Sequence, residues 1–392
     1  MEDIIEKYSG NPSLFFLLIS WLIAGGIQMI YHGLLFSRIW WQKPKNSPGP
    51  SLPKLSLIVA IHNEEKNLPE LLEQLQKQKY PEDWELLFVD DRSTDSSRKL
   101  LLEQKKFNSH LNIISINETP AGKSPKKYAI QQGILHAQHN HMVFTDADCR
   151  PASEDWLFLM ASKFQKNIQF VLGYSPYNFH KGFLNLFIRF ETLLSGISYL
   201  SLAMWGNPYM GVGRNLAYQK GFFLDHGGFS KHDQILSGDD DLLVNEMANK
   251  HNTDWEIHPA AFVYSKPKES WRAFIHQKTR HLSAGVKYRF TDRLLLGCWV
   301  ISKVFFWLLL PLNLWHFGLS INLLAFGLLV VAVISINIKL SAERLREKVS
   351  IWSIPILDLL YVFYYVLTGL RTLFIKQTQW NHHQERHFQQ KH

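Results

Sequence analysis

The chain is poor in cysteine and in charged side chains. Of 392 residues only Cys149 and Cys298 are cysteines, which excludes a disulfide scaffold and a zinc site built from several cysteines. Charged residues make up 19% and hydrophobic residues 46%, the opposite of the composition of a disordered chain. A G-x-G-x-x-G pattern after a strand and a G-x-x-x-x-G-K-[ST] pattern are both absent. A dinucleotide oxidoreductase and a P-loop enzyme therefore lose their main support.

The composition that remains indicates two unlike parts. The mean hydropathy of −0.12 lies between the values of a soluble enzyme and of a membrane bundle. The formal net charge is +8, which suits an anionic membrane surface. No basic stripe with interleaved aromatic residues occurs, so we do not expect nucleic acid as a partner.

A first membrane span is predicted near the N-terminus. Residues 14–37 carry no charged side chain, and about 20 apolar residues are enough to cross a bilayer. The preceding residues are acidic and the run is long, which argues against a cleaved signal peptide. We therefore expect an extracytoplasmic segment over 1–13, a transmembrane helix over 14–37 and a linker over 38–54.

Further spans are predicted near the C-terminus. The uncharged run 304–338 would be about 50 Å long as one helix, against a bilayer core of about 30 Å, so it has to break. Pro311, Asn313 and His316 mark the expected break, which gives a transmembrane hairpin over 294–338 with spans near 294–315 and 318–338. A last span is expected over 352–374. The His- and Gln-rich tail, 380–392, is predicted to be disordered.

The basic residues that flank these runs set the expected orientation. Short basic flanks favour the cytoplasmic side of a membrane. The flanking residues are Arg38, Lys43, Lys45 and Lys54 after the first run and Lys339, Arg344, Arg346 and Lys348 after the hairpin. We therefore expect a multi-pass protein of the cell (inner) membrane whose polar middle lies in the cytoplasm.

The middle of the chain alternates between strand and helix patterns. Apolar runs bounded by turn residues predict strands over 55–61, 84–89, 111–116 and 141–145. Helical patterns follow from Leu68, from a cap at Ser93 or Thr94, and over 126–138. This alternation predicts an α/β fold with a mostly parallel sheet flanked by helices, within a domain over 55–290. The apolar segment 183–205 suits an interfacial helix, with a buried core helix as the alternative.

Polar and acidic residues follow three of these strands at their carboxyl ends, the edge where open α/β sheets bind ligands. They are His62, Asn63 and Glu64, then Asp90 and Asp91, then Asp146 and Asp148. Turns and helix caps also favour Asp and Ser, so each cluster alone has a purely structural explanation. Two carboxylates on one turn, however, suit a divalent cation that also binds substrate phosphates.

A second acidic cluster follows at Asp239, Asp240 and Asp241. Adjacent carboxylates repel one another, which raises the pKa of at least one and suits a general base. The same residues also suit the start of a helix, because anions are stabilised at the positive end of the helix dipole. Ser237-x-x-Asp240 resembles a capping box, which would occupy Asp240 and leave Asp239 free.

These motifs together resemble glycosyltransferase family 2 with its GT-A fold, especially the membrane-embedded branch that contains cellulose and hyaluronan synthases. The resemblance covers about Leu55 to Gly285, and its strength lies in the order of seven short motifs. They are AIHNE (60–64), VDDRSTD (89–95), KKYAI (126–130), TDAD (145–148), GRNLAY (213–218), GDDDL (238–242) and QKTRH (277–281).

The resemblance implies roles for individual residues. The nucleotide-sugar would be held by the first two motifs and by Lys126, Asp146, Arg214 and Asn215, with Asp91 contacting the base. Asp146 and Asp148 would bind Mg²⁺ or Mn²⁺. The family's catalytic acid pair falls on 238–239 or 239–240, so Asp239 is the expected general base and Asp240 the alternative. Gln277, Arg280 and His281 take the place of the family's Gln-x-x-Arg-Trp, near the acceptor and the diphosphate.

The implied activity is a single inverting displacement. A sugar would pass from a nucleotide-sugar, UDP- or GDP-linked, to a lipid-linked or cell-envelope glycan acceptor, and partners from a polysaccharide or glycolipid assembly system would fit. A processive polysaccharide synthase is the alternative, although the missing Trp and the few spans favour single transfer. A transporter is less favoured, because it would require six or so spans with ionisable residues inside them.

Overall fold

The computed structural model describes residues 12–42, 51–165, 167–233, 235 and 238–374. Two compact units share the chain. The helical unit comprises Met1–Lys43, Arg189–Trp205 and Arg289–Leu367, and the sheet unit comprises Pro44–Ile188, Gly206–Tyr288 and Thr368–His392. Most of segment 1–13, Ser237, residues 43–50 of the linker and the tail 380–392 lie outside the described residues.

Four parallel strands form one half of the main sheet. They are β1 (Leu55–Ile61), β2 (Trp84–Asp91), β3 (Leu111–Ile116) and β4 (His141–Phe144), in the order β3-β2-β1-β4. β1 pairs with β2 and β4 on its two sides, and six of its seven residues are buried. Its continuous apolar sequence is therefore explained by a strand covered on both faces.

The second half of the sheet contains the antiparallel pairings. β7 (Leu216–Gln219) runs antiparallel to β4 and to β6 (Phe170–Gly173), and β6 pairs in parallel with β8 (Thr253–Glu256). A separate two-stranded sheet joins β5 (Cys149–Pro151) to β9 (Val263–Ser265). The α/β class and the mostly parallel sheet are thus confirmed, whereas the sequence patterns did not predict the small sheet.

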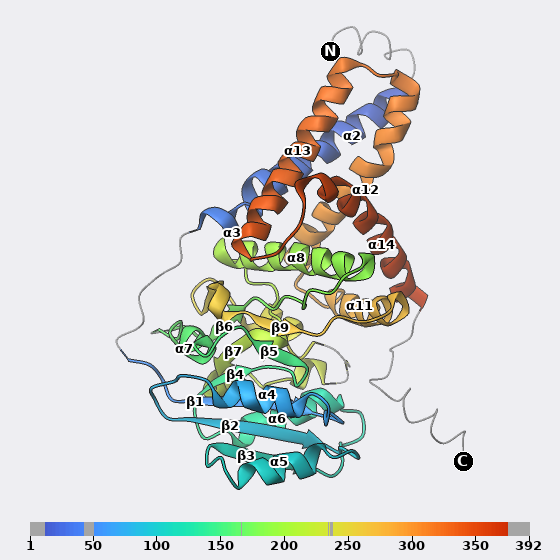
Figure 1. The fold of residues 1–392 in the computed structure, drawn as a ribbon. Coiled ribbons are helices and arrows are strands. Elements are labelled where there is room, and N and C mark those ends of the chain that lie inside the picture. The colour runs from blue at the N-terminus through green and yellow to red at the C-terminus, as the bar shows by residue number, and fades with distance from the viewer. Residues whose placement is uncertain (1–11, 43–50, 166, 234, 236–237, 375–392) are drawn as a thin grey trace, which may run out of the picture. The chain divides into compact units, whose positions relative to one another are not determined.

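The sheet unit also contains seven α-helices in the part of the chain that the structure describes (Figure 1). They are α4 (Leu68–Gln76), α5 (Ser97–Lys105), α6 (Pro125–His136), α7 (Trp156–Ala161), α9 (Lys220–Asp225), α10 (Asp241–Met247) and α11 (Trp271–Gly285). α6 packs closely on β1 and β2, since a Cβ at Gly133 would lie 2.8 Å from Ile58 Cγ2. The predicted cap of α5 was wrong: Ser96 takes that position, because Ser93 and Thr94 bond to Asn63.

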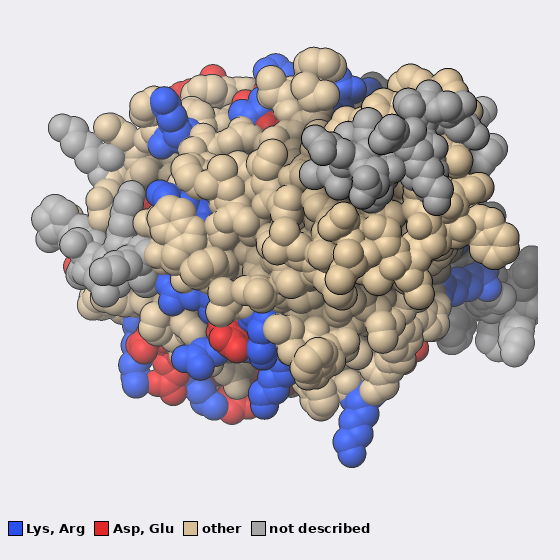
Figure 2. Space-filling view, turned by 90° about the horizontal axis from the view of Figure 1, so that it is seen from above, with Lys and Arg blue, Asp and Glu red and all other residues tan. Residues whose placement is uncertain are grey.

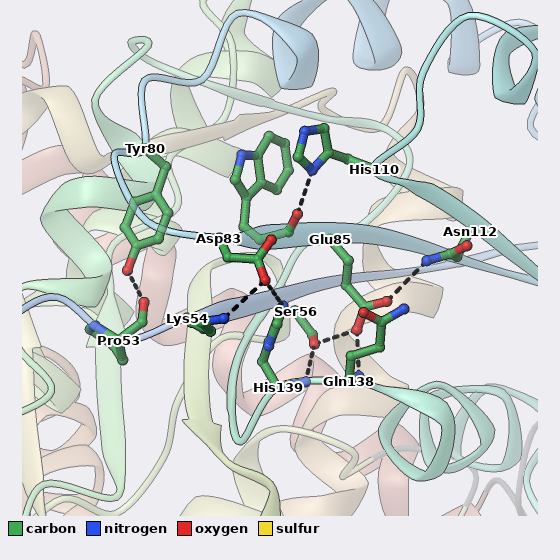
Figure 3. Close-up of polar contacts among 11 residues, drawn as sticks. Pro53, Lys54, Ser56, Tyr80, Asp83, Glu85, His110, Asn112, Gln138 and His139 are labelled. Carbon is green, nitrogen blue, oxygen red and sulfur yellow. Dashed lines mark hydrogen bonds and ion pairs between the residues drawn. The ribbon is translucent and has the colours of Figure 1, made fainter.

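A buried carboxylate holds the amino-terminal edge of the sheet together (Figure 3). Glu85 is 3% exposed, and its Oε1 accepts hydrogen bonds from Ser56 Oγ at 2.6 Å and from the Gln138 N–H at 2.5 Å. Asn112 Nδ2 donates to Glu85 Oε2 at 3.1 Å. One side chain of β2 thus connects β1, β3 and the end of α6.

Long apolar helices make up the helical unit. They are α2 (Pro12–Ile30), continued by the π-helical turn η1 (Tyr31–Leu35) and α3 (Arg38–Trp41), then α12 (Phe290–Phe317), α13 (Ile321–Arg344), most of α14 (Ile354–Phe374) and most of α8 (Phe183–Met204). α2 packs against α12 and α13. The Trp21 ring stacks on Phe306 at 5.9 Å and meets Phe326 edge-on at 5.2 Å.

Two details of the predicted spans need correction. The chain turns after α12 at Gly318, which has φ +66°, whereas Pro311 lies inside α12. A left-handed residue without a side chain reverses the chain more readily than a proline about two turns earlier. Residues 38–41 of the expected linker form α3, because Trp40 and Trp41 pack and hydrogen-bond within the helical unit.

Five helices among the described residues are long and apolar enough to cross a membrane: Pro12–Trp41, Phe183–Met204, Phe290–Phe317, Ile321–Arg344 and Ile351–Thr372. Figure 2 shows few Lys, Arg, Asp or Glu side chains across the centre of its view. Charges buried in this unit are paired, Lys303 with Asp358 and Arg189 with Glu347. The composition indicates a membrane protein, while the individual spans stay predictions. α8 differs from the other four in being 83% buried over its most apolar window, which favours the core-helix alternative.

Candidate active site

The loops that follow β1 and β2 lock together at the carboxyl edge of the sheet. Asn63 has φ +57°, and its Oδ1 accepts hydrogen bonds from the N–H groups of Thr94 at 2.8 Å and Asp95 at 3.3 Å. His62 Nδ1 lies 2.6 Å from the carbonyl oxygen of Asp91. The first two sequence motifs are therefore in direct contact, because they follow adjacent parallel strands.

Asp90 and Asp91 are both buried at the end of β2. Asp90 Oδ1 accepts the Ser93 N–H at 3.1 Å, so this carboxylate shapes the turn. Asp91 accepts two hydrogen bonds from Arg92, at 2.8 Å from Nε and 3.2 Å from a terminal nitrogen. The partner of Asp90 is thus a backbone N–H, whereas that of Asp91 is the side chain of Arg92, which is partly exposed. Asp91 is therefore the better candidate of the two for contact with a ligand.

A metal-binding geometry follows β4. Ligand atoms of Asp146, Asp148 and Cys149 lie within 4.8 Å of one another, and Cys149 Sγ donates to Asp148 Oδ1 at 3.3 Å. Burial, reinforced by the charges of Asp148 and Asp146, raises the pKa of the Cys149 thiol, so it is neutral near pH 7. Two partly exposed carboxylates remain as hard oxygen ligands, a donor set that fits Mg²⁺ or Mn²⁺.

Glu64 belongs to the same acidic region. Its Oε2 accepts a hydrogen bond from Asn67 Nδ2 at 2.6 Å. Burial raises the pKa of Glu64, and the charges of Asp148 and Asp146 raise it further, against the effect of Asn67. The motif after β1 and the acidic pair after β4 are therefore electrostatically coupled.

Lys126 connects the two acidic clusters that the sequence separates by some ninety residues. Its Nζ lies 3.2 Å from Asp146 Oδ1 and 3.0 Å from Asp239 Oδ2. Although burial opposes its charge, Asp146 and Asp239 hold the pKa of Lys126 above its usual value. The three side chains line a small cavity together with Gly213 and Tyr218.

The three adjacent aspartates have three different environments. Burial disfavours the charge of Asp239, but the ion pair with Lys126 lowers its pKa. Asp240 is the N-cap of α10 and accepts the N–H groups of Asp241 at 2.8 Å and Gly213 at 2.7 Å. Burial and then the charge of Asp239 raise the pKa of Asp240. For Asp241, burial and then Asp240 raise the pKa to about 7, although Tyr288 donates to Asp241 Oδ2 at 2.8 Å.

Arg214 and Asn215, both predicted to contact the nucleotide-sugar, lie in different surroundings. The Arg214 guanidinium lies over the Tyr177 ring at 4.6 Å and donates to the Ser175 carbonyl at 3.3 Å. Asn215 is completely buried, and its amide donates to the carbonyls of Tyr174 and Ala261, both at 2.8 Å. Its Oδ1 accepts from Trp156 Nε1 at 3.0 Å. The amide group of Asn215 thus connects the β7 region to α7, and its contact with a donor sugar stays a prediction.

The Gln-x-x-Arg-His motif lies on α11. Gln277, Arg280 and His281 are spaced three and four residues apart, so they share one helix face. Gln277 Oε1 is buried and has no hydrogen-bond partner among the described residues. Buried polar atoms are normally hydrogen-bonded, so this oxygen is suited to accept a hydrogen bond from a ligand. α11 packs against α10, which begins at the acidic cluster.

Three residues of this region were not assigned from the sequence. They are Cys149 beside the acidic pair, Tyr177 beneath Arg214, and Tyr288 on Asp241. Adjacency to Asp148 was the one available signal for Cys149. Nothing in the sequence pattern links Tyr288 to Asp241, because that contact depends on the packing of the end of α11.

Comparisons with known proteins agree with this geometry. Glycosyl transferase family 2 matches residues 56–228. The chain is 25% identical over 285 residues to the probable glycosyltransferase YdaM of Bacillus subtilis, covering 69% of this chain and 65% of that protein. It is 32% identical over 112 residues to an undecaprenyl-phosphate 4-deoxy-4-formamido-L-arabinose transferase of Proteus mirabilis, covering 28% of this chain and 33% of that one.

A solved structure shares the fold. The mannosyltransferase PcManGT from Pyrobaculum calidifontis, solved with GDP-Man and Mn²⁺, aligns with a TM-score of 0.57 at 17% identity, over 85% of this chain and 98% of that chain. The chain spans under two thirds of YdaM and about a third of the arabinose transferase. Its sheet unit has a GT-A-like fold and carries a glycosyltransferase family 2 domain. Residues 56–228 are thus similar to glycosyltransferase family 2, and apolar helices lie at both ends of the described chain.

Proposed function

We propose that this protein is a membrane-bound inverting glycosyltransferase that moves a sugar from a UDP- or GDP-sugar to a lipid-linked or cell-envelope glycan acceptor. The observation that supports it best is the pair of contacts made by Lys126, which brings Asp146 and Asp239 into one cluster. A donor diphosphate and an acceptor hydroxyl would have to meet at such a place, because the acceptor oxygen attacks the same anomeric carbon from which the diphosphate leaves, while the base takes the hydroxyl proton.

The donor side is assigned to the carboxyl edge of β1, β2 and β4. His62, Asn63, Glu64, Asp90 and Asp91 shape the nucleotide pocket, with Asp91 on the base. Asp146 and Asp148 would hold Mg²⁺ or Mn²⁺, which neutralises charge that develops on the leaving diphosphate. Lys126 and Arg214 place two further cations at this edge. When a diphosphate enters, Lys126 can exchange a carboxylate for a phosphate oxygen without leaving the site.

We assign the general base to Asp240, the alternative of the two aspartates. A base has to keep enough proton affinity to remove an acceptor proton. The Lys126 ion pair lowers the pKa of Asp239, whereas burial and the neighbouring charge raise that of Asp240. The two backbone N–H groups on Asp240 also fix its orientation. Asp239 then has an electrostatic role, holding Lys126 in place.

The acceptor side is assigned to α11, with Gln277, Arg280 and His281. The undecaprenyl-phosphate transferase of Proteus mirabilis supports a lipid-linked acceptor for this chain. The apolar helices support the same class, because a polyprenyl chain has to remain in the bilayer. The basic flanks favour the cytoplasmic side of the inner membrane for the sheet unit, where nucleotide-sugars would be available. Partners from a glycolipid or polysaccharide assembly system would fit there.

A processive polysaccharide synthase remains the second candidate function, on the strength of the Gln-x-x-Arg motif. His281 offers a smaller stacking surface than Trp in that motif, which favours a single transfer. Product length decides between them: one added sugar by mass spectrometry supports single transfer, and a ladder of long products supports processive synthesis.

The activity is tested with purified full-length protein in detergent and a panel of UDP- and GDP-sugars. We expect release of nucleoside diphosphate from one donor when Mn²⁺ or Mg²⁺ is present, and none in excess chelator. Asp146→Asn should abolish release while the melting temperature stays near that of the wild type. Undiminished release in chelator would contradict the metal assignment, and release from no donor of the panel would contradict the proposed donor class.

A further inference from the structure

An arginine at the end of the first apolar helix lies in a corner between two tryptophans. The Arg38 guanidinium carbon is 4.3 Å from the centre of the Trp41 ring and 4.6 Å from that of Trp205. The two rings meet at 77° with their centres 6.3 Å apart. All three residues belong to the helical unit, although more than 160 residues separate Trp205 from the other two.

The corner is rigid. Trp205 Nε1 donates to the Leu35 carbonyl at 3.0 Å, and Trp41 Nε1 donates to Ser37 Oγ at 3.3 Å. Both indoles are therefore fixed by hydrogen bonds at their polar ends, yet Trp41 and Trp205 remain 45% and 43% exposed. Large aromatic rings held half-exposed in this way are typical of the membrane–water interface.

Arg38 has no anionic partner among the described residues. No ion pair involves it there, and its Nε is buried without a hydrogen-bond acceptor. Arg38 as a whole is half-buried, and Arg344 of the same unit also has a buried Nε without an acceptor. The fully buried cations Arg189 and Lys303 in the described ranges have carboxylate partners, Glu347 and Asp358. A buried N–H of a charged group that lacks an acceptor is costly, so an acceptor from outside the described residues would be stabilising.

The position of Arg38 indicates where that acceptor comes from. The residue follows directly after the uncharged run 14–37, so it lies at the level where the chain leaves the apolar core of the bilayer. At this level the abundant anion is the phosphate of a lipid headgroup, and a planar guanidinium binds phosphate oxygens through paired donors.

We propose that Arg38, Trp41 and Trp205 form a binding site for the phosphate of an anionic phospholipid headgroup. This site would orient the helical unit at the bilayer surface and is independent of the proposed transfer reaction.

The site is tested by native mass spectrometry of the full-length protein, released from detergent that contains equal amounts of phosphatidylglycerol and phosphatidylcholine. Wild-type protein should retain phosphatidylglycerol in preference to phosphatidylcholine. Arg38→Gln should lower that preference about tenfold, the effect of one lost charge-assisted contact. Arg38→Lys should give a smaller loss, because lysine keeps the charge but not the planar pair of donors.

Lys348→Gln is the matched control, since it removes an exposed positive charge from another basic flank of the same unit. An equal loss in this control would overturn the proposal in favour of unspecific attraction. Full retention of phosphatidylglycerol by Arg38→Gln would overturn it directly. If Arg38→Gln fails to elute as folded protein, Trp41→Leu is used instead. This variant keeps the charge of Arg38 and removes one of the two indole rings beside it. A lipid preference equal to that of the wild type would then contradict the site.

Discussion

Three neighbouring aspartates of identical chemistry differ in what surrounds them. Asp239 faces the Lys126 ammonium, Asp240 accepts two backbone N–H groups, and Asp241 accepts the hydroxyl of Tyr288. Their pKa values shift in different directions for that reason, down for the first and up for the other two. Separation of this kind lets one carboxylate hold a cation while its neighbour acts as a base.

The two candidate bases can be distinguished by charge-neutral variants. We expect Asp240→Asn to leave donor binding almost unchanged and to lower transfer by at least about 10²-fold, the usual range for loss of a general base. Asp239→Asn should weaken donor binding more than transfer from bound donor, because Lys126 loses one of its two anchors. Single-turnover transfer and calorimetric donor binding measure the two effects. A dead Asp239→Asn beside an active Asp240→Asn would return the base to Asp239.

Asp241 gives a prediction for the pH dependence of stability. Its folded pKa of about 7 lies above the ordinary value of 3.8. Between these values the folded state holds a proton that the unfolded state has lost, so this contribution to stability is present at low pH and is lost as the pH rises through 7. Asp241→Asn remains neutral throughout and should flatten the fall in melting temperature between pH 5 and 8. Asp225→Asn, at an exposed site, is the control; a wild-type slope in Asp241→Asn would contradict the assignment.

At the scale of elements, the two edges of the main sheet have different tasks. The carboxyl edge collects the acidic motifs, and the loops after β1 and β2 brace each other through Asn63. The amino edge carries Glu85, whose two oxygens serve three donors from separate segments. The amino edge therefore holds the strands in register without taking part in the candidate site.

Glu85→Gln tests that structural role. The new amide nitrogen would face a donor where the wild type has an acceptor, and a buried unsatisfied group costs about 1–3 kcal/mol. We expect a lower midpoint of thermal unfolding, followed by circular dichroism, with donor-dependent turnover kept at low temperature. The nearby Asp83→Asn removes a half-exposed carboxylate that contacts Lys54 at 3.3 Å and His139 at 3.7 Å, and it should change the midpoint little. Equal effects of the two variants would show that the Glu85 network adds no stability.

At the scale of the whole molecule, the chain combines a glycosyltransferase domain with helices suited to a membrane. Segments from three parts of the sequence form the helical unit, including most of α8 from the middle of the chain. Residues 189–205, which lie within the predicted domain over 55–290, belong to the helical unit. The charged residues that this arrangement buries, Arg189 and Lys303, find carboxylates elsewhere in the helical unit.

The topology is tested by cysteine labelling in a background that lacks Cys149 and Cys298. We expect Lys45→Cys and Lys348→Cys to react from the cytoplasmic side, since both lie in basic flanks. Leu319→Cys, at the exposed turn between α12 and α13, should react from the opposite side. Reaction of Leu319→Cys and Lys348→Cys from the same side would remove the transmembrane hairpin.

Local patterns were enough to predict much of this protein. Apolar runs bounded by turn residues predicted the four parallel strands, and longer uncharged runs predicted the long helices. Segments that are buried on both faces of a sheet or in a bilayer consist of continuous apolar residues. The alternation of strands and helices predicted that the polar motifs lie at the carboxyl ends of the strands, the edge where ligands bind. The seven ordered motifs indicated the glycosyltransferase family, which the comparisons then supported.

Only the tertiary structure decided what each polar side chain contacts. Lys126 between Asp146 and Asp239, Asn215 enclosed by backbone carbonyls, and Arg38 between Trp41 and Trp205 all depend on residues brought together from distant parts of the chain. The strength of an acid or the satisfaction of an amide is set by such neighbours and by burial. A sequence lists these groups but does not contain the distances between them, and electrostatic and hydrogen-bond energies depend on distance.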